Sequence, residues 1–219
     1  MFVVIFEVQP RKERWDDYLA LAKQLKPKLE AIDGFIDNER FASTRAAGRL
    51  LSLSTWRDEK AIVRWRTHGE HHGVQEKGRS EIFADYHLRV GAITADTHPP
   101  HGARITQQRL DETEVGAARS VTITEATASA GAPALAAALG LDPSAGGLVD
   151  HELFESIYNA GKCLLLASWR DPRAASAWKP APIAAARSPR HRQVRVVRDY
   201  GMFDRREAPQ FYPEVVRRS

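Results

Sequence analysis

An internal repeat places the strongest limit on how this chain can fold. The segment "FASTRAAGRLLSLSTWRDEKAIVRW" at 41–65 recurs without a gap as "FESIYNAGKCLLLASWRDPRAASAW" at 154–178. Trp56 and Trp65 are matched by two further tryptophans, so four of the five tryptophans in the chain fall at equivalent places. Self-similarity of this kind indicates a tandem duplication. The chain should therefore contain two copies of one folding unit.

The two copies extend beyond this matched segment. Glu7 aligns with Glu125 in strand-like sequences near the start of each copy, and Glu39 aligns with Glu152. Between the copies lies a polar stretch with two prolines, which reads as a linker. The predicted division is a first unit at 1–96, a linker at 97–117, a second unit at 118–204 and a C-terminal tail at 205–219.

Hydrophobic patterning within the first unit predicts the order β-α-β-β-α-β. Asp58 is expected to cap the second helix, and Gly48 to form the turn between the two central strands. This order is the ferredoxin-like arrangement, an antiparallel sheet with helices on one face, so the fold class is α+β. In the second unit the first helix is shorter, and prolines after Trp178 leave room for only one or two helical turns. The expected segments of the first unit are strands at 2–8, 35–43, 49–56 and 83–93 and helices starting at 15 and 59.

Composition is that of an ordinary globular protein, with 43% hydrophobic and 27% charged residues. No stretch approaches the roughly 20 apolar residues of a membrane span, and no basic segment precedes the apolar start, so we expect a cytoplasmic protein with no membrane partner. The single Cys163 has apolar neighbours and reads as a buried residue. The net charge of +4 comes from the arginine-rich end, where arginines alternate with valines as on a half-solvated strand. We therefore expect no nucleic-acid partner.

The stretch "RTHGEHHG" at 66–73 holds three of the eight histidines. On one continuous helix His68, His72 and Glu76 would share a face at i, i+4 and i+8. The outer two would then be about 12 Å apart along the axis, which is too far for one metal ion with bonds near 2 Å. We predict no metal site here.

The same histidines are better suited to acid/base chemistry. A neutral imidazole has an ordinary pKa near 6.5, so at the edge of an apolar pocket it can accept and return a proton. We predict that His68 or His72 is the catalytic base, because the face that they share can point inward, whereas His71 lies off that face. Trp65 would supply an aromatic wall for the substrate. The second unit has no matching cluster, so one working site is expected.

The order of motifs resembles the antibiotic biosynthesis monooxygenase superfamily of dimeric α+β barrels. The motifs are "VVIFEV", "IDGFI", "ERF", "GRLLSLSTWRDE", "VRWRTH" and "FADY" in the first unit and "LLLASWRD" in the second. The resemblance implies that two sheets pair into a barrel, and a tandem chain can close it as an intramolecular pseudodimer. Pairing of two chains as a homodimer is the alternative.

The resemblance also implies an activity. The expected activity is that of a cofactor-independent monooxygenase, whose partners are a small aromatic or quinol-like substrate and molecular oxygen. In such an enzyme the base deprotonates the substrate, whose carbanion then reacts with oxygen. Arg40 or Tyr86 would orient the substrate.

Two other functions stay open. Because the sequence has no specific catalytic motif and its second unit is degenerate, the chain is alternatively a non-catalytic binding or structural barrel. The heme-degrading branch of the superfamily is the second alternative, since its members resemble this chain around Trp65. However, Gln75 stands where the heme-ligand histidine is expected, and Phe6 stands where the first-strand asparagine is expected.

Overall fold

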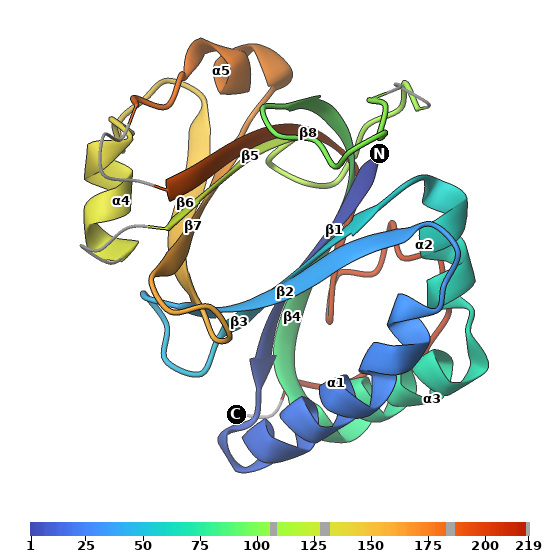
Figure 1. Ribbon diagram of the computed structural model, residues 1–219. Helices are drawn as coiled ribbons and strands as arrows, with labels where there is room; N and C mark the ends of the chain where they lie inside the picture. The colour runs from blue at the N-terminus through green and yellow to red at the C-terminus, as the bar shows by residue number, and fades with distance from the viewer. Residues whose placement is uncertain (106–108, 128–131, 183–186, 218–219) are drawn as a thin grey trace.

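A closed β-barrel forms the centre of the molecule. The computed structural model describes residues 1–105, 109–127, 132–182 and 187–217. Within these ranges the strands pair antiparallel in the closed order β1-β3-β2-β6-β7-β5-β8-β4. Figure 1 shows the helices of the first unit on one outer side of the barrel and those of the second unit on the opposite side.

Each unit contributes four strands, in the order that the sequence predicts. The first unit contains β1 (Phe2–Pro10), α1 (Trp15–Glu30), β2 (Phe35–Ser43), β3 (Leu50–Trp56), α2 (Glu59–Arg66), α3 (Gly69–Lys77) and β4 (Phe83–Asp96). A 3-10 turn at Lys12–Arg14 precedes α1, and a π-helical turn at Gly78–Ile82 follows α3. The second unit contains β5 (Ser120–Thr127), α4 (Ala132–Ala138), β6 (Leu148–Ser156), β7 (Lys162–Trp169), α5 (Pro172–Ala177) and β8 (Arg187–Gly201). The α+β class and the ferredoxin-like order are confirmed.

The two units meet along two pairs of strands. β2 pairs with β6 through Phe41 opposite Ser156, and β4 pairs with β8 from His87 to Asp96. Apolar side chains from both units fill the interior, among them Ile5, Leu53, Ile123, Phe154, Leu166 and Val194. The barrel therefore closes within one chain, as the pseudodimer interpretation predicts, while a further homodimer stays a prediction. The domain limits at 96, 117 and 204 also stay predictions, although β4 ends at Asp96 and β5 begins at Ser120.

Strand alternation gives each sheet two different faces. Along β1, Ile5 belongs to the barrel interior, whereas Val4 and Phe6 pack on the helix side. The helix side of the first unit is where the site lies. Asp58 caps α2 there by accepting a hydrogen bond from the backbone N–H of Ala61 at 2.8 Å. The cap fixes the start of α2 against the sheet.

The second unit has a thinner helical layer, as the sequence predicts. α4 has 7 residues, against 16 in α1, and α5 has 6. Trp178 directly follows α5 and stacks on Trp169, with ring centroids 5.9 Å apart, in the core of that unit. None of the helices in the described ranges is long and apolar enough to cross a membrane.

Candidate active site

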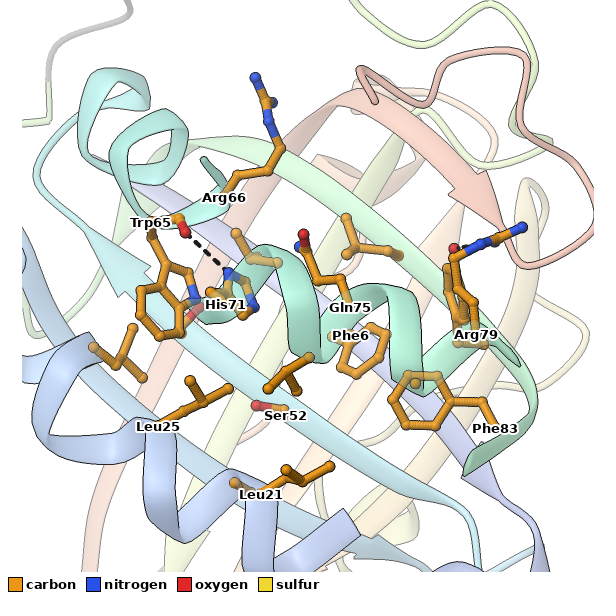
Figure 2. Close-up of a pocket in the computed structure, with 18 of the residues that line it drawn as sticks. Phe6, Leu21, Leu25, Ser52, Trp65, Arg66, His71, Gln75, Arg79 and Phe83 are labelled. Atoms are coloured by element: carbon orange, nitrogen blue, oxygen red, sulfur yellow. Dashed lines mark hydrogen bonds between the residues drawn. The ribbon is translucent and has the colours of Figure 1, made fainter. Parts of the chain in front are cut away.

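A cavity of about 200 Å³ lies between the sheet of the first unit and its helices. Its floor consists of outward side chains of the strands, and its walls come from α1, α2 and α3 (Figure 2). Most of the lining is apolar and includes Val4, Phe6, Leu21, Leu25, Val74 and Leu88. This volume lies below the roughly 300–1,000 Å³ of sites for drug-sized molecules, so the cavity suits a small apolar ligand.

The histidine segment does not form the continuous helix that the sequence argument assumed. α2 ends at Arg66, and α3 begins at Gly69, so His68 is the residue before a new helix. The Thr67 hydroxyl donates to the carbonyl of Val63 at 2.9 Å at the end of α2. Each residue turns an α-helix by about 100°, so this break changes which histidine faces the sheet.

His71 is the histidine that lines the cavity; His68 and His72 are not among the lining residues. The expectation that His68 and His72 share the inward face was therefore wrong. His72 is exposed and stacks on Tyr212 with ring centroids 5.3 Å apart. The catalytic role of His68 or His72 stays a prediction, but neither ring borders the cavity.

Contacts with Trp65 hold the His71 ring in place. The two rings are stacked, with centroids 4.0 Å apart and an interplanar angle of 14°. Nδ1 of His71 lies 2.9 Å from the backbone carbonyl oxygen of Trp65 (Figure 2). Because a carbonyl only accepts hydrogen bonds, Nδ1 carries the proton in the neutral ring. Nε2 is then left with a lone pair that can accept a proton from a ligand.

The surroundings of His71 keep it neutral at physiological pH. Burial lowers its pKa to about 4, and the hydrogen bond to the Trp65 carbonyl offsets only part of this effect. The nearby rings of His68 and His72 lower the pKa further. His71 is therefore neutral at pH 7, and its Nε2 is available to accept a proton.

Trp65, Arg40 and Tyr86, which the sequence predicts as substrate-binding residues, all line the cavity. Trp65 comes from α2 and Tyr86 from β4, and the two side chains belong to different hydrophobic clusters. Arg40 of β2 hydrogen-bonds the hydroxyls of Tyr18 and Tyr158. The structure brings these three residues to one cavity, and their roles in binding stay predictions.

Sequence reasoning missed the part that the C-terminal tail takes in the site. Tyr212 and Gln210 line the cavity, and the Tyr212 hydroxyl donates to Oε1 of Gln75 at 2.9 Å. Gln210 donates to the backbone carbonyl of Arg66 at 3.2 Å. The described tail has no helix or strand, so no periodic pattern signals this contact. The tail therefore closes one side of the cavity against α3.

Among the described residues, no group of three or more His, Cys, Asp or Glu side chains is arranged to hold a metal ion. Heme must also be compared with the cavity, because the superfamily that the sequence resembles includes heme-degrading members. A heme is larger than drug-sized ligands, and a cavity of about 200 Å³ is below even their range. Heme does not fit this cavity as it stands.

The fold defines an α+β barrel protein with a cavity between the sheet and the helices of its first repeat. The family model described as "Antibiotic biosynthesis monooxygenase" matches residues 1–77. The Pyricularia oryzae protein named jasmonate monooxygenase ABM is 44% identical over 220 residues, which cover 97% of this chain and 99% of that protein. The chain belongs to the antibiotic biosynthesis monooxygenase family.

Two further proteins are similar to this chain. The uncharacterised protein YqjZ of Bacillus subtilis is 42% identical over 92 residues, which are 42% of this chain and 78% of that protein. A crystal structure of aldoxime dehydratase aligns with a TM-score of 0.53 at 13% identity, covering 89% of this chain and 80% of that chain. The second likeness concerns the fold alone.

Proposed function

We propose that the protein is a cofactor-independent monooxygenase that acts on a small, mainly apolar molecule in the cavity of the first unit. The observation that carries the proposal is His71, a neutral base stacked on Trp65 at the edge of an apolar cavity. The full-length likeness to a protein named as a monooxygenase supports the reaction class.

The reaction needs a substrate with an acidic hydrogen. Nε2 of His71 takes the proton from a C–H or O–H group, and the resulting carbanion or enolate donates electrons to molecular oxygen. For a CH2 group, the peroxide that forms loses water and leaves a carbonyl, so that CH2 and O2 give C=O and H2O. The proton held by His71 returns to the departing hydroxide. The substrate supplies all the electrons, so this reaction balances without a further reductant.

Two substrate classes meet this requirement. Aromatic or quinol-like compounds, which the sequence argument favours, form stabilised anions and can lie against Trp65. The relative is named for jasmonate, a ketone with acidic hydrogens beside its carbonyl.

Oxygen uptake tests the proposal directly. We expect uptake with at least one member of a panel of anthrones, hydroquinones and jasmonate. Loss of a general base typically costs 10²–10⁴-fold, so His71→Ala should lower the rate by about that factor. His72→Ala is the matched control, because His72 lies on the same helix but outside the cavity lining. A rate that falls in His72→Ala and not in His71→Ala would restore His72 as the base.

The alternatives have their own outcomes in the same experiment. A ligand that binds in the cavity without any oxygen uptake across the panel would favour a non-catalytic binding barrel. A shift of the Soret band on addition of hemin, lost in His71→Ala, would favour the heme alternative.

A further inference from the structure

The cavity is lined by more positively charged than negatively charged side chains. Among the described residues, the lining contains five cationic side chains and no aspartate or glutamate: Lys26, Arg40, Arg66, Arg79 and Arg205. Lys26 is exposed and lies 3.8 Å from the carboxylate of Glu30, whereas Arg79 is buried, and buried charges are normally paired. Two of these arginines, Arg79 and Arg205, come together at the end that the C-terminal tail closes.

Neutral atoms supply the acceptors for both arginines. Arg79 is only 4% exposed and donates to the Tyr86 hydroxyl at 2.8 Å and to the carbonyls of Met202 and Pro213. Arg205 donates to the same hydroxyl at 2.7 Å and to the carbonyl of Gln210 at 2.8 Å. Nε of Arg79 is buried and has no hydrogen-bond partner. Two guanidinium groups thus converge on one phenol oxygen with neutral acceptors alone.

The shared hydroxyl of Tyr86 is itself prepared to donate. Its oxygen accepts one hydrogen bond from Arg79 and one from Arg205. These two hydrogen bonds occupy both acceptor positions of the oxygen. The phenolic proton is left for a third partner. Tyr86 lines the cavity, so a ligand oxygen there would receive this proton beside two positive charges.

We propose that Arg79, Arg205 and Tyr86 form an anion-recognition subsite, and that the ligand is an elongated apolar molecule with a carboxylate at one end. Arginine is well suited to carboxylates because its N–H groups match the two carboxylate oxygens. Binding of a carboxylate at this subsite does not depend on the proposed function. Only the identification of that carboxylate as the substrate rests on the proposed function.

The position of the subsite also sets the length of the ligand. His71 and Arg79 lie at opposite ends of the helical segment that covers the cavity, with Leu21, Leu25 and Ser52 beneath it (Figure 2). Eight residues at 1.5 Å each separate them by about 12 Å along the axis. A ligand held at Arg79 by its carboxylate would therefore present to His71 an atom remote from that carboxylate.

Calorimetric titration of the full chain tests the subsite without depending on turnover. The probes are jasmonate and straight-chain carboxylates of increasing length, each compared with its own methyl ester. We expect at least one acid to bind about tenfold or more tightly than its ester, as a charge-assisted hydrogen bond predicts, with an optimum length in the series. If no acid binds more tightly than its ester, the proposal is overturned.

Arg205→Gln is the main variant, because Arg205 is half-buried and lies in the tail outside the barrel. It should abolish the preference for acid over ester, whereas a merely structural loosening of the tail would weaken acid and ester alike and keep their ratio. Arg206→Gln is the matched control, since Arg206 is exposed and already paired with Asp204 at 2.5 Å. An unchanged acid preference in Arg205→Gln would also overturn the proposal. Acid binding without any oxygen uptake would leave the subsite standing and count against the monooxygenase alone.

Discussion

Arg89 and Arg192 occupy equivalent positions in the two repeats and make the same two contacts. Arg89 donates to Glu7 of its own unit at 2.6 Å and to the Ser168 hydroxyl of the other unit at 2.8 Å. Arg192 donates to Glu125 at 3.0 Å and to the Thr55 hydroxyl at 3.2 Å. Each arginine thus joins the two units across the barrel interior. The duplicated sequence reproduces inside one chain the reciprocal contacts of a twofold interface.

Removal of either arginine should destabilise the whole barrel. Arg89 is 3% exposed, so Arg89→Met removes the more deeply buried of the two arginines that pair with the buried Glu7 carboxylate and leaves Arg49, at 2.5 Å, as the remaining one. Removing one partner of a buried ion pair lowers the unfolding free energy by roughly 3–5 kcal/mol. Urea denaturation of the variant and the wild type measures this loss. Arg192→Met should show a loss of similar size, because its environment is equivalent.

Two further variants make that prediction specific. Arg89→Met combined with Glu7→Gln should recover part of the loss, since the buried side chain that lost Arg89 then carries no charge. Arg206→Gln should change the unfolding free energy little, because its ion pair is exposed. A loss in Arg89→Met no larger than in Arg206→Gln would contradict the role of this contact.

The acid side of the pH–rate profile should report His71. A base is active when unprotonated, and kcat/KM follows the ionisation of the free enzyme. Because burial lowers the pKa of His71 to about 4, the acid-side decrease assigned to this residue should lie near pH 4. Oxygen uptake measured across the pH range checks this position. An acid-side decrease near pH 6.5, the ordinary value for histidine, would contradict the assignment to His71.

The same shift predicts how stability depends on pH. Between pH 6.5 and about 4, the histidine takes up a proton in the unfolded chain while His71 stays neutral in the folded protein. The unfolded state then binds more protons, so stability falls as pH falls through this window. His71→Gln should flatten this part of the curve, measured as unfolding free energy against pH. The interpretation fails if the variant and the wild type keep parallel curves from pH 6.5 to 4.

Local patterns explain why much of the fold could be predicted from the sequence. The cap at Asp58, the order of the strands and the shorter helical layer before Trp178 depend on residues close in sequence. The tandem duplication added the long-range information that the two sheets are equivalent. Trp65, Arg40 and Tyr86 line the cavity, and helix and strand periodicity decides which side of its element each of them faces.

The rest of the site depends on features that periodicity does not record. Because the helix is interrupted at Thr67, α3 begins in a new orientation about its axis. The residue that faces the cavity is therefore His71 and not its neighbour His72. Arg205 and Tyr212 reach the cavity from an irregular tail, whose path is decided by contacts with distant residues. No motif within the tail marks these contacts, so the sequence alone left the cationic end of the cavity unassigned.

Tyr212 should control how well the cavity is closed. Its hydroxyl donates to Gln75, and its ring stacks on His72, so it fastens the tail to α3. Tyr212→Ala should raise KM about tenfold, since it removes both a wall of the cavity and a hydrogen bond, and should change kcat much less. Steady-state oxygen uptake gives both constants. Phe211→Ala is the control, because Phe211 is 91% exposed and should behave like the wild type. Equal effects in the two variants would show that the tail does not close the cavity through Tyr212.

Trp65 and Trp178 are equivalent in the repeat but should differ in what they support. Trp178 is 9% exposed and stacks on Trp169 in the core of the second unit, so Trp178→Ala should lower the unfolding free energy by about 3–5 kcal/mol. Trp65 is half-buried, lines the cavity and supports the His71 ring. Trp65→Ala should therefore lower the unfolding free energy less than Trp178→Ala does. At a temperature where both variants are folded, Trp65→Ala should reduce kcat/KM for oxygen uptake by the larger factor. Urea denaturation and oxygen uptake on the same two variants separate the effects. If both substitutions reduced the unfolding free energy and kcat/KM in the same proportion, the two tryptophans would have the same role. The cavity of the first unit would then not be a site that differs in function from the second unit.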